Sequence, residues 1–116
     1  MNKKQKSNLI TILIFVIIIV IALISFTGKN YPKTDEETAK CIGEKATLYV
    51  QLGCSHCEDQ EKIFGNNLKY INSIDCFYNS QTCLDEQIEV TPTWKIKGEL
   101  YKGIQTIEEL QDLTGC

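Results

Sequence analysis

The residues best suited to chemistry are two cysteines in a C-x-x-C arrangement, Cys54 and Cys57. They follow an alternating apolar run, 46–52, and precede a segment with helical character, 58–64. A C-x-x-C at a strand-to-helix junction indicates a thiol–disulfide redox site. Cys54 is expected at the start of the helix, where free N–H groups and the positive end of the helix dipole favour a thiolate. Cys57 lies three residues later on the same face and can close a disulfide with it.

These positions predict different roles for the two sulfurs. Cys54 is the predicted nucleophile, and Cys57, which we expect to be more buried, is the resolving thiol that releases a mixed disulfide. His56 lies between them, and a protonated imidazole there would stabilise the Cys54 thiolate and make the disulfide more oxidising. The alternative for His56 is an exposed residue at the helix start without such an effect.

Four further cysteines lie in the same part of the chain. Outside the cytosol, an even number in a small domain indicates disulfides, although the sequence alone does not fix their pairing. We interpret Cys76 and Cys83 as a structural disulfide worth about 2.5 kcal/mol; the alternative is a second redox pair that exchanges electrons with the first. Cys41 and Cys116 would close nearly the whole domain and contribute about 4.5 kcal/mol. Their alternatives are two free thiols, or an intermolecular bridge through Cys116.

The N-terminal segment is a candidate membrane anchor. Residues 9–26 include 16 apolar side chains among 18 and no charge. At about 1.5 Å per residue they span roughly 27 Å, close to the thickness of a hydrocarbon core. The run is longer than a typical signal-peptide core and ends without a clear small-residue cleavage site, so an uncleaved anchor is preferred to a signal peptide. The lysines at 3, 4 and 6 place the basic tail, 1–8, in the cytoplasm.

The rest of the chain then lies outside the cytoplasm, which makes this a single-pass protein of the cell membrane. Residues 27–33 form a tether and residues 34–116 a small domain. From residue 29 onward there are nine lysines, fifteen acidic residues and no arginine. Nothing in this composition suggests a nucleic-acid partner.

Hydrophobic periodicity and capping signals predict the elements that must position the cysteines. Thr34 with Glu37, and Thr106 with Glu109, have the spacing of capping boxes. The order is β-α-β-α-β-β-α, preceded by one extra helix. The predicted elements are a helix at 34–42, a strand at 46–52, the C-x-x-C helix ending near 65–67, a strand at 70–77, a helix at 79–88, a strand from 90, a strand at 100–102 and a helix from 106 to 115.

This order, with C-x-x-C before its first helix and Thr91-Pro92 opening its third strand, resembles the thioredoxin superfamily over about residues 44–114. In detail it resembles the thioredoxin-like domains fused to, or working beside, vitamin K epoxide reductase homologues, and C-x-H-C is typical of the oxidant DsbA. The residues that carry this closer likeness are Cys54-Ser55-His56-Cys57, Phe64-Gly65, Asp75-Cys76, Cys83, Pro92-Thr93-Trp94 and Leu113-Thr114-Gly115-Cys116.

The resemblance implies an α/β, three-layer thioredoxin-like fold with a mixed four-stranded sheet, behind one transmembrane helix. It also implies that Pro92 is cis and faces the cysteine pair, whereas a strand-opening proline by itself would be trans. Thr91 would then offer backbone groups to an extended substrate. Gly53 and Ser55, which flank Cys54, are the other predicted substrate-binding residues.

The predicted function is a membrane-anchored thiol–disulfide oxidoreductase that acts on cysteine-containing secreted proteins. The resemblance implies that a membrane quinone-linked oxidoreductase, similar to vitamin K epoxide reductase or DsbB, recycles it. No cofactor and no metal are predicted. One alternative is a zinc- or copper-binding module, because Cys54, Cys57, Cys76 and Cys83 have a partly zinc-like spacing. Another is a non-catalytic interaction domain stapled by disulfides.

Overall fold

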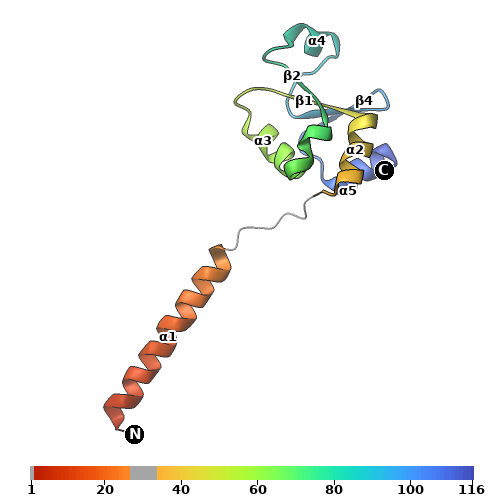
Figure 1. The fold of residues 1–116 in the computed structure, drawn as a ribbon. Coiled ribbons are helices and arrows are strands. Elements are labelled where there is room, and N and C mark those ends of the chain that lie inside the picture. Colours follow the sequence, from red (N-terminus) through yellow and green to blue (C-terminus); the bar gives the residue numbers. More distant parts are fainter. Residues whose placement is uncertain (1, 27–33) are drawn as a thin grey trace. The chain divides into compact units, whose positions relative to one another are not determined.

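The computed structural model of the chain describes residues 2–26 and 34–116. The N-terminal helix and the C-terminal domain are two separate units (Figure 1). The predicted tether, 27–33, lies outside the described residues.

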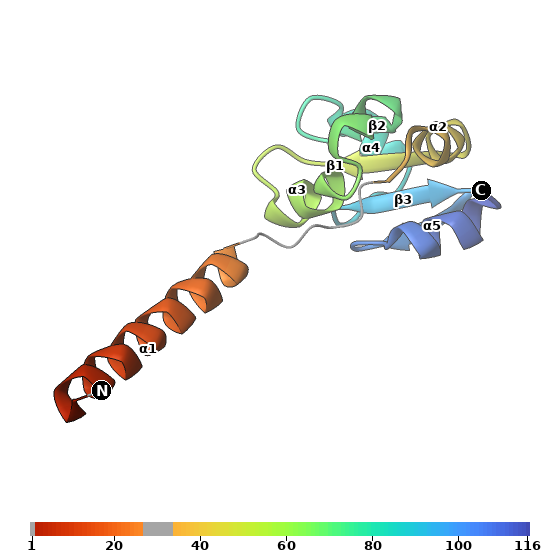
Figure 2. The same cartoon turned by 60° about the horizontal axis from the view of Figure 1, so that its bottom comes forward.

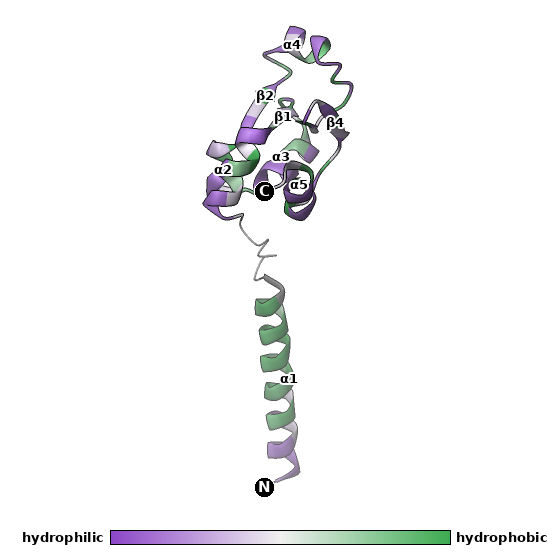
Figure 3. Cartoon of the chain, turned by 90° about the vertical axis from the view of Figure 1, so that its right-hand side faces the viewer, coloured by the Kyte–Doolittle hydropathy of each residue, from purple (hydrophilic) through white to green (hydrophobic). Residues whose placement is uncertain are grey.

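The N-terminal unit is one long helix, α1 (Lys3–Phe26). Apolar side chains between Leu9 and Ile24 are exposed, and the strongly hydrophilic residues of the helix lie at its N-terminal end (Figure 3). A helix that is apolar on every face is typical of a membrane span or of the core of a large protein. The Thr11 hydroxyl donates to the Ser7 carbonyl at 2.9 Å and is thus satisfied inside the helix. Among the described residues, one helix is long and apolar enough to cross a membrane, and the predicted anchor lies within it.

The domain is organised on a mixed sheet of four strands in the order β2-β1-β3-β4 (Figure 1). β2 runs parallel to β1, whereas β3 is antiparallel to β1 and to β4. The predicted sheet and element order are therefore confirmed. The strands are β1 (Ala46–Val50), β2 (Asn72–Asp75), β3 (Thr93–Ile96) and β4 (Glu99–Lys102).

Helices α2 (Glu36–Lys45), α3 (Ser55–Lys62) and α5 (Ile107–Thr114), with the 3₁₀ helix η1 (Gly65–Tyr70), enclose the main core (Figure 2). Alternation along β1 and β3 directs Leu48 and Trp94 into this core, and both are fully buried. The Phe64 ring packs against Trp94, with 6.0 Å between ring centroids. This core is where the sheet and the cysteine-bearing helix meet.

Glu86, the residue that follows α4 (Ser80–Asp85), lies at the opposite face of the sheet. Tyr49 is buried on this face, and the side chain of Lys95, which lies beside it, pairs with Glu86. α4 has only six residues instead of extending to 88 as predicted. The third layer of the fold is therefore thin.

Several predicted boundaries at the start of the domain were wrong. The N-cap of α2 is Asp35, whose carboxylate accepts the Thr38 N–H at 2.9 Å, because the Thr34 hydroxyl donates instead to the Ile63 carbonyl at 2.8 Å. The helix also does not stop at Gly43 but continues to Lys45. Gly43 is needed for close packing, since a Cβ there would lie 1.9 Å from the Tyr70 carbonyl oxygen.

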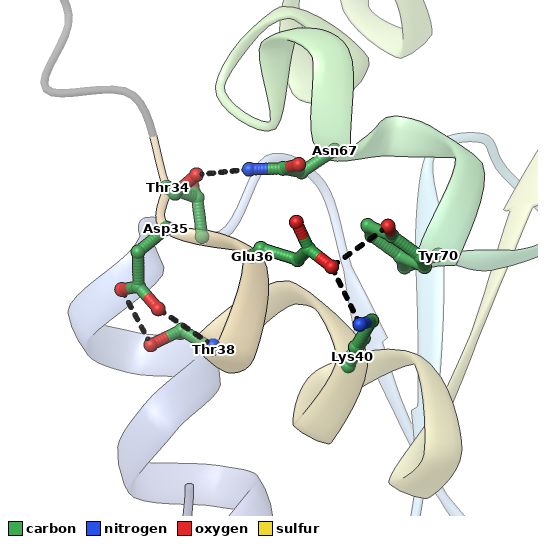
Figure 4. A network of polar contacts seen from close by, with 7 residues as sticks. All are labelled: Thr34, Asp35, Glu36, Thr38, Lys40, Asn67 and Tyr70. Carbon is green, nitrogen blue, oxygen red and sulfur yellow. Dashed lines mark hydrogen bonds and ion pairs between the residues drawn. The ribbon is translucent and has the colours of Figure 1, made fainter.

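Polar contacts fasten the start of α2 to η1 (Figure 4). The Asn67 amide donates to the Thr34 carbonyl at 2.8 Å, and the Tyr70 hydroxyl donates to Glu36 at 2.9 Å. The Lys40 ammonium also bonds Glu36 and lies 4.7 Å from the centre of the Tyr70 ring. The hydrogen bonds from Lys40 and Tyr70 hold the pKa of the Glu36 carboxyl below its ordinary value.

Strand ends also differ from the prediction for local reasons. The strand predicted at 46–52 ends at Val50, and Leu52 beyond it is 58% exposed. β2 is shorter than 70–77 because Asp75 bonds the Phe77 N–H at 2.8 Å and turns the chain. By contrast, the predicted capping box at Thr106 and Glu109 and the end of α5 at Gly115, with φ 75°, are confirmed.

Two disulfides close loops of very different length. Cys41 and Cys116 are 75 residues apart, and Cys76 and Cys83 are 7 apart. Chain entropy therefore predicts that replacing both Cys41 and Cys116 by alanine lowers the free energy of unfolding by about 4.5 kcal/mol, against about 2.5 kcal/mol for the shorter pair. Urea unfolding of the two double variants without reductant measures this order. Equal losses, or a larger loss for the shorter loop, would contradict it.

Candidate active site

Cys54 is the N-cap residue of α3. A tight turn separates it from β1: its N–H donates to the Gln51 carbonyl at 3.1 Å, and Gly53 has a φ of 81°, which favours glycine. The Cys57 N–H then donates to the Cys54 sulfur at 3.2 Å. The sulfur thus takes the place that a Ser or Asp oxygen holds in other caps, at the positive end of the helix. A thiolate at Cys54 is stabilised by this N–H and by the helix end together.

The two sulfurs of the C-x-x-C pair differ in access. They form a disulfide with 5.2 Å between their Cα atoms. Cys57 is only 3% exposed and belongs to the core, while Cys54 is half-buried at the edge of that core. An incoming thiolate can therefore reach the Cys54 sulfur, with Cys57 as the leaving group.

Thr91 lies against the same sulfur. The Thr91 hydroxyl donates to Cys54 Sγ at 3.6 Å, and the Thr91 carbonyl oxygen is also 3.6 Å from it. The bond between Thr91 and Pro92 is cis, and Pro92 is buried. The Cys54 sulfur, which caps the helix after β1, therefore contacts the residue that precedes a cis proline at the start of β3.

The mixed sheet in the order β2-β1-β3-β4, the C-x-x-C at the start of α3 and the cis proline before β3 together make a thioredoxin-like fold. No family model matches the chain. It is similar to the thiol-disulfide oxidoreductase LTO1 of Arabidopsis thaliana, with 35% identity over 101 residues. The match covers 79% of this chain and 26% of that protein, so the chain spans only a part of this relative. Among solved structures it is similar to the NTD_N/C domain of alkylhydroperoxide reductase AhpF from Enterococcus faecalis, with a TM-score of 0.44 and 18% identity, over 69% of this chain and 44% of that one.

Ser55 and His56 occupy the first turn of α3 and are both exposed. No hydrogen bond among the described residues joins His56 to Cys54. An effect of His56 on the cysteine pair would therefore act through its charge, and it stays a prediction. Ser55 and Gly53 are exposed beside Cys54, where a bound substrate could contact them.

The remaining cysteines form two further disulfides of the thioredoxin-like domain. Cys76 pairs with Cys83, and the Cys76 N–H donates to the Val50 carbonyl at 2.8 Å, which continues the pairing of β2 with β1. Cys83 is 5% exposed. Cys41 on α2 pairs with Cys116 beyond α5. The Cys76–Cys83 bond thus lies close to the turn that leads to Cys54.

Asp75 supports this turn, and the sequence interpretation assigned it no role there. Its carboxylate accepts the Leu52 N–H at 3.2 Å and the Phe77 N–H at 2.8 Å, so it links the chain segments that leave β1 and β2. An aspartate at the end of a strand, followed by a turn, is a recognisable signal for such bonding.

Glu61 is a second acid that the sequence interpretation did not single out. It lies one turn after Cys57 on α3, so the two side chains share a face. Burial, followed by the negative charges of Glu58 and Asp75, raises the pKa of the Glu61 carboxyl above its ordinary value. Glu61 and Glu58, with Lys62, Gly65 and Leu68, line an open hollow that includes neither cysteine of the pair.

The hydroxyl of Thr91 should stabilise the Cys54 thiolate and so raise the reactivity of Cys54 at a fixed pH. Thr91→Val keeps the shape but removes the donor to Cys54 Sγ, so we expect the reduced protein to react with iodoacetamide about three- to tenfold more slowly at fixed pH. The alkylation rate of Cys54, followed by mass spectrometry, measures this. Thr82→Val makes the same change at an exposed position on α4. An unchanged rate in Thr91→Val, or an equal loss in the control, would contradict the assignment.

The carboxyl of Glu61 should make stability depend on pH. Its pKa is raised by folding, so the stability that it contributes is fully present below its ordinary pKa and is lost as the pH rises through the raised value. Glu61→Gln should therefore increase the free energy of unfolding at about pH 7.5 and change it little at about pH 3.5. Urea unfolding at both pH values tests this, with the exposed Glu44→Gln on α2 as the control. An equal effect of Glu61→Gln at both pH values would refute the explanation.

Proposed function

We propose that this chain is a membrane-anchored thiol–disulfide oxidoreductase, whose domain outside the cytoplasm exchanges disulfides with secreted proteins through Cys54 and Cys57. The observation that carries the proposal is the asymmetry of the pair. The half-buried residue Cys54 caps a helix and contacts Thr91 through its sulfur, and it is bonded to Cys57, a residue that is only 3% exposed. Such a pair is attacked at one sulfur and released by the other.

The first step begins with a thiolate of the client protein, which attacks Cys54 Sγ. The bond between Cys54 and Cys57 breaks, a mixed disulfide forms between the client and Cys54, and Cys57 leaves as a thiolate that takes up a proton. The incoming chain reaches Cys54 beside Thr91, whose backbone can pair with an extended segment. Thr91, Gly53 and Ser55 are therefore the proposed substrate-binding residues.

In the second step another client thiolate attacks the client's own sulfur in the mixed disulfide. The client leaves with a new disulfide, and Cys54 leaves as a thiolate. Two electrons have moved from the client dithiol to the Cys54–Cys57 pair. The Cys57 N–H, the helix end and the Thr91 hydroxyl stabilise the departing Cys54 thiolate. The same steps in reverse reduce a client disulfide, and the potentials of the two pairs set the direction.

A reduced pair needs an electron acceptor before it can act again. The likeness to domains that work beside vitamin K epoxide reductase homologues supports a membrane thiol oxidoreductase of that kind, or one resembling DsbB, as the acceptor. An anchored domain stays near the membrane in which such a partner lies. The same oxidoreductase would take two electrons from the Cys54–Cys57 dithiol and restore its disulfide.

Two features support the location. Lys3, Lys4 and Lys6 precede the apolar part of α1, and basic residues favour the cytoplasmic side. The domain beyond it has three disulfides, which form and persist in oxidising surroundings.

The pairing of the cysteines also favours redox chemistry over the metal-binding alternative. Cys54, Cys57, Cys76 and Cys83 form two separate disulfides instead of one group of four thiolates. In the part of the chain that the structure describes, no three His, Cys, Asp or Glu side chains gather as ligands.

A trapping experiment tests the proposal with the full chain in cells that secrete disulfide-bonded proteins. Cys57→Ala leaves Cys54 without its resolving thiol, so we expect mixed disulfides with clients to accumulate. Acid quenching, non-reducing electrophoresis and mass spectrometry of the trapped adducts identify the bonded cysteine.

Cys54→Ala and the double variant are the matched controls, and both should trap nothing at this site. If Cys57→Ala also traps nothing, or if its adducts form through another cysteine, the proposed function is wrong.

A further inference from the structure

Gln60 on α3 is a fully buried amide in an otherwise largely apolar core. It lies three residues after Cys57, on the face of the helix that Cys57 also occupies. Burying an amide costs free energy unless its hydrogen bonds are made, and an unbranched apolar side chain would fill the same space without this cost. The bonds that Gln60 makes therefore indicate its role.

Three hydrogen bonds hold this amide. Gln60 Oε1 accepts the Trp94 indole N–H at 3.0 Å and the Gln105 backbone N–H at 2.7 Å. Gln60 Nε2 donates to the Gln105 carbonyl at 3.1 Å. Both lone pairs of the amide oxygen are thus used, and the donors come from two different parts of the chain.

Both parts lead to the segment that faces Cys54. Trp94 lies in β3, three residues after Thr91. Gln105 follows Gly103, whose N–H donates to the Pro92 carbonyl at 2.8 Å. Among the described residues, Gln60 carries every side-chain hydrogen bond that joins α3 to β3 or to the 103–106 segment. The Gln60 side chain therefore connects α3 both to β3 and to the 103–106 segment, and these two parts of the chain hold Thr91 and Pro92 in place.

We propose that Gln60 is a positioning residue for the redox pair: it holds α3 in register with the Thr91–Pro92 segment, so that the Thr91 hydroxyl meets the Cys54 sulfur. The proposal rests on the proposed exchange function of Cys54 and Cys57. The contact that it protects is 3.6 Å long and spans two elements, so a small shift of α3 against β3 weakens it. Gln60 itself touches neither sulfur through a hydrogen bond and acts through Thr91.

A double-mutant cycle on the full chain in detergent tests this. Gln60→Met removes all three bonds at similar volume, and Thr91→Val removes the protected contact. Each single variant should make the Cys54–Cys57 disulfide a weaker oxidant, shifting its equilibrium constant with glutathione by about three- to tenfold. If Gln60 acts through Thr91, Gln60→Met has nothing left to disturb once Thr91→Val has removed the contact. Adding Gln60→Met to Thr91→Val should therefore change the equilibrium constant less than twofold.

Two controls separate positioning from a general loss of stability. Gln111→Met makes the same change on α5, and Ile42→Val weakens the core on α2 without touching the network. Both should leave the equilibrium constant within about twofold of the wild-type value, even where urea unfolding shows a loss of stability.

A further variant gives a graded test. Trp94→Phe removes one of the three hydrogen bonds of Gln60 and should shift the equilibrium constant less than Gln60→Met does.

The outcomes distinguish the two proposals. If Gln60→Met destabilises the domain but leaves the constant unchanged, or if its effect adds fully to that of Thr91→Val, Gln60 is a core residue only and the inference fails while the exchange function stands. If the wild-type pair does not equilibrate with glutathione at all, the proposed function fails and the inference with it.

Discussion

The first turn of α3 is the feature on which the rest of the site depends. A helix leaves its first N–H groups without partners inside the helix, and here the Cys57 N–H finds the Cys54 sulfur at 3.2 Å. The cap that starts the helix is thus also the reactive atom. This arrangement gives the sulfur a partial positive environment, although no cationic side chain of the described residues is hydrogen-bonded to it, and it fixes Cys57 on the buried side of the same turn.

The strands of the sheet hold this turn in place. β1 delivers the chain to Gly53, whose positive φ lets it reverse into α3 within a few residues. Asp75 links the ends of β1 and β2 through two backbone N–H groups, and β3 brings Thr91 to the other side of the sulfur. The ends of β1 and β2 and the segment that precedes β3 thus lie around the turn that carries Cys54, and Gln60 joins α3 to β3 from inside the core.

Size explains why so much of the domain is bonded covalently. A domain of this length buries a limited core, and each closed loop removes freedom from its unfolded chain. Cys41–Cys116 joins the two ends of the domain, and Cys76–Cys83 closes the turn after β2. The redox disulfide differs from both because Cys54 is the N-cap of a helix, where its sulfur accepts the Cys57 N–H and the Thr91 hydroxyl.

The sequence by itself determined the C-x-x-C helix, the four strands and their order, the cap at Thr106 and the apolar helix α1, because each depends on local periodicity or on a short motif. It did not determine the N-cap of α2, the use of Gly43 for close packing, or the shortness of β2 and α4. Those depend on which distant group competes for a bond or a space: Ile63 takes the Thr34 hydroxyl, and the Tyr70 carbonyl lies against Gly43. The disulfide pairing, the contact of Thr91 with Cys54 and the bonds of Gln60 join residues far apart in the chain. Only the tertiary structure decided them, because no local pattern records which surfaces the folded sheet brings together.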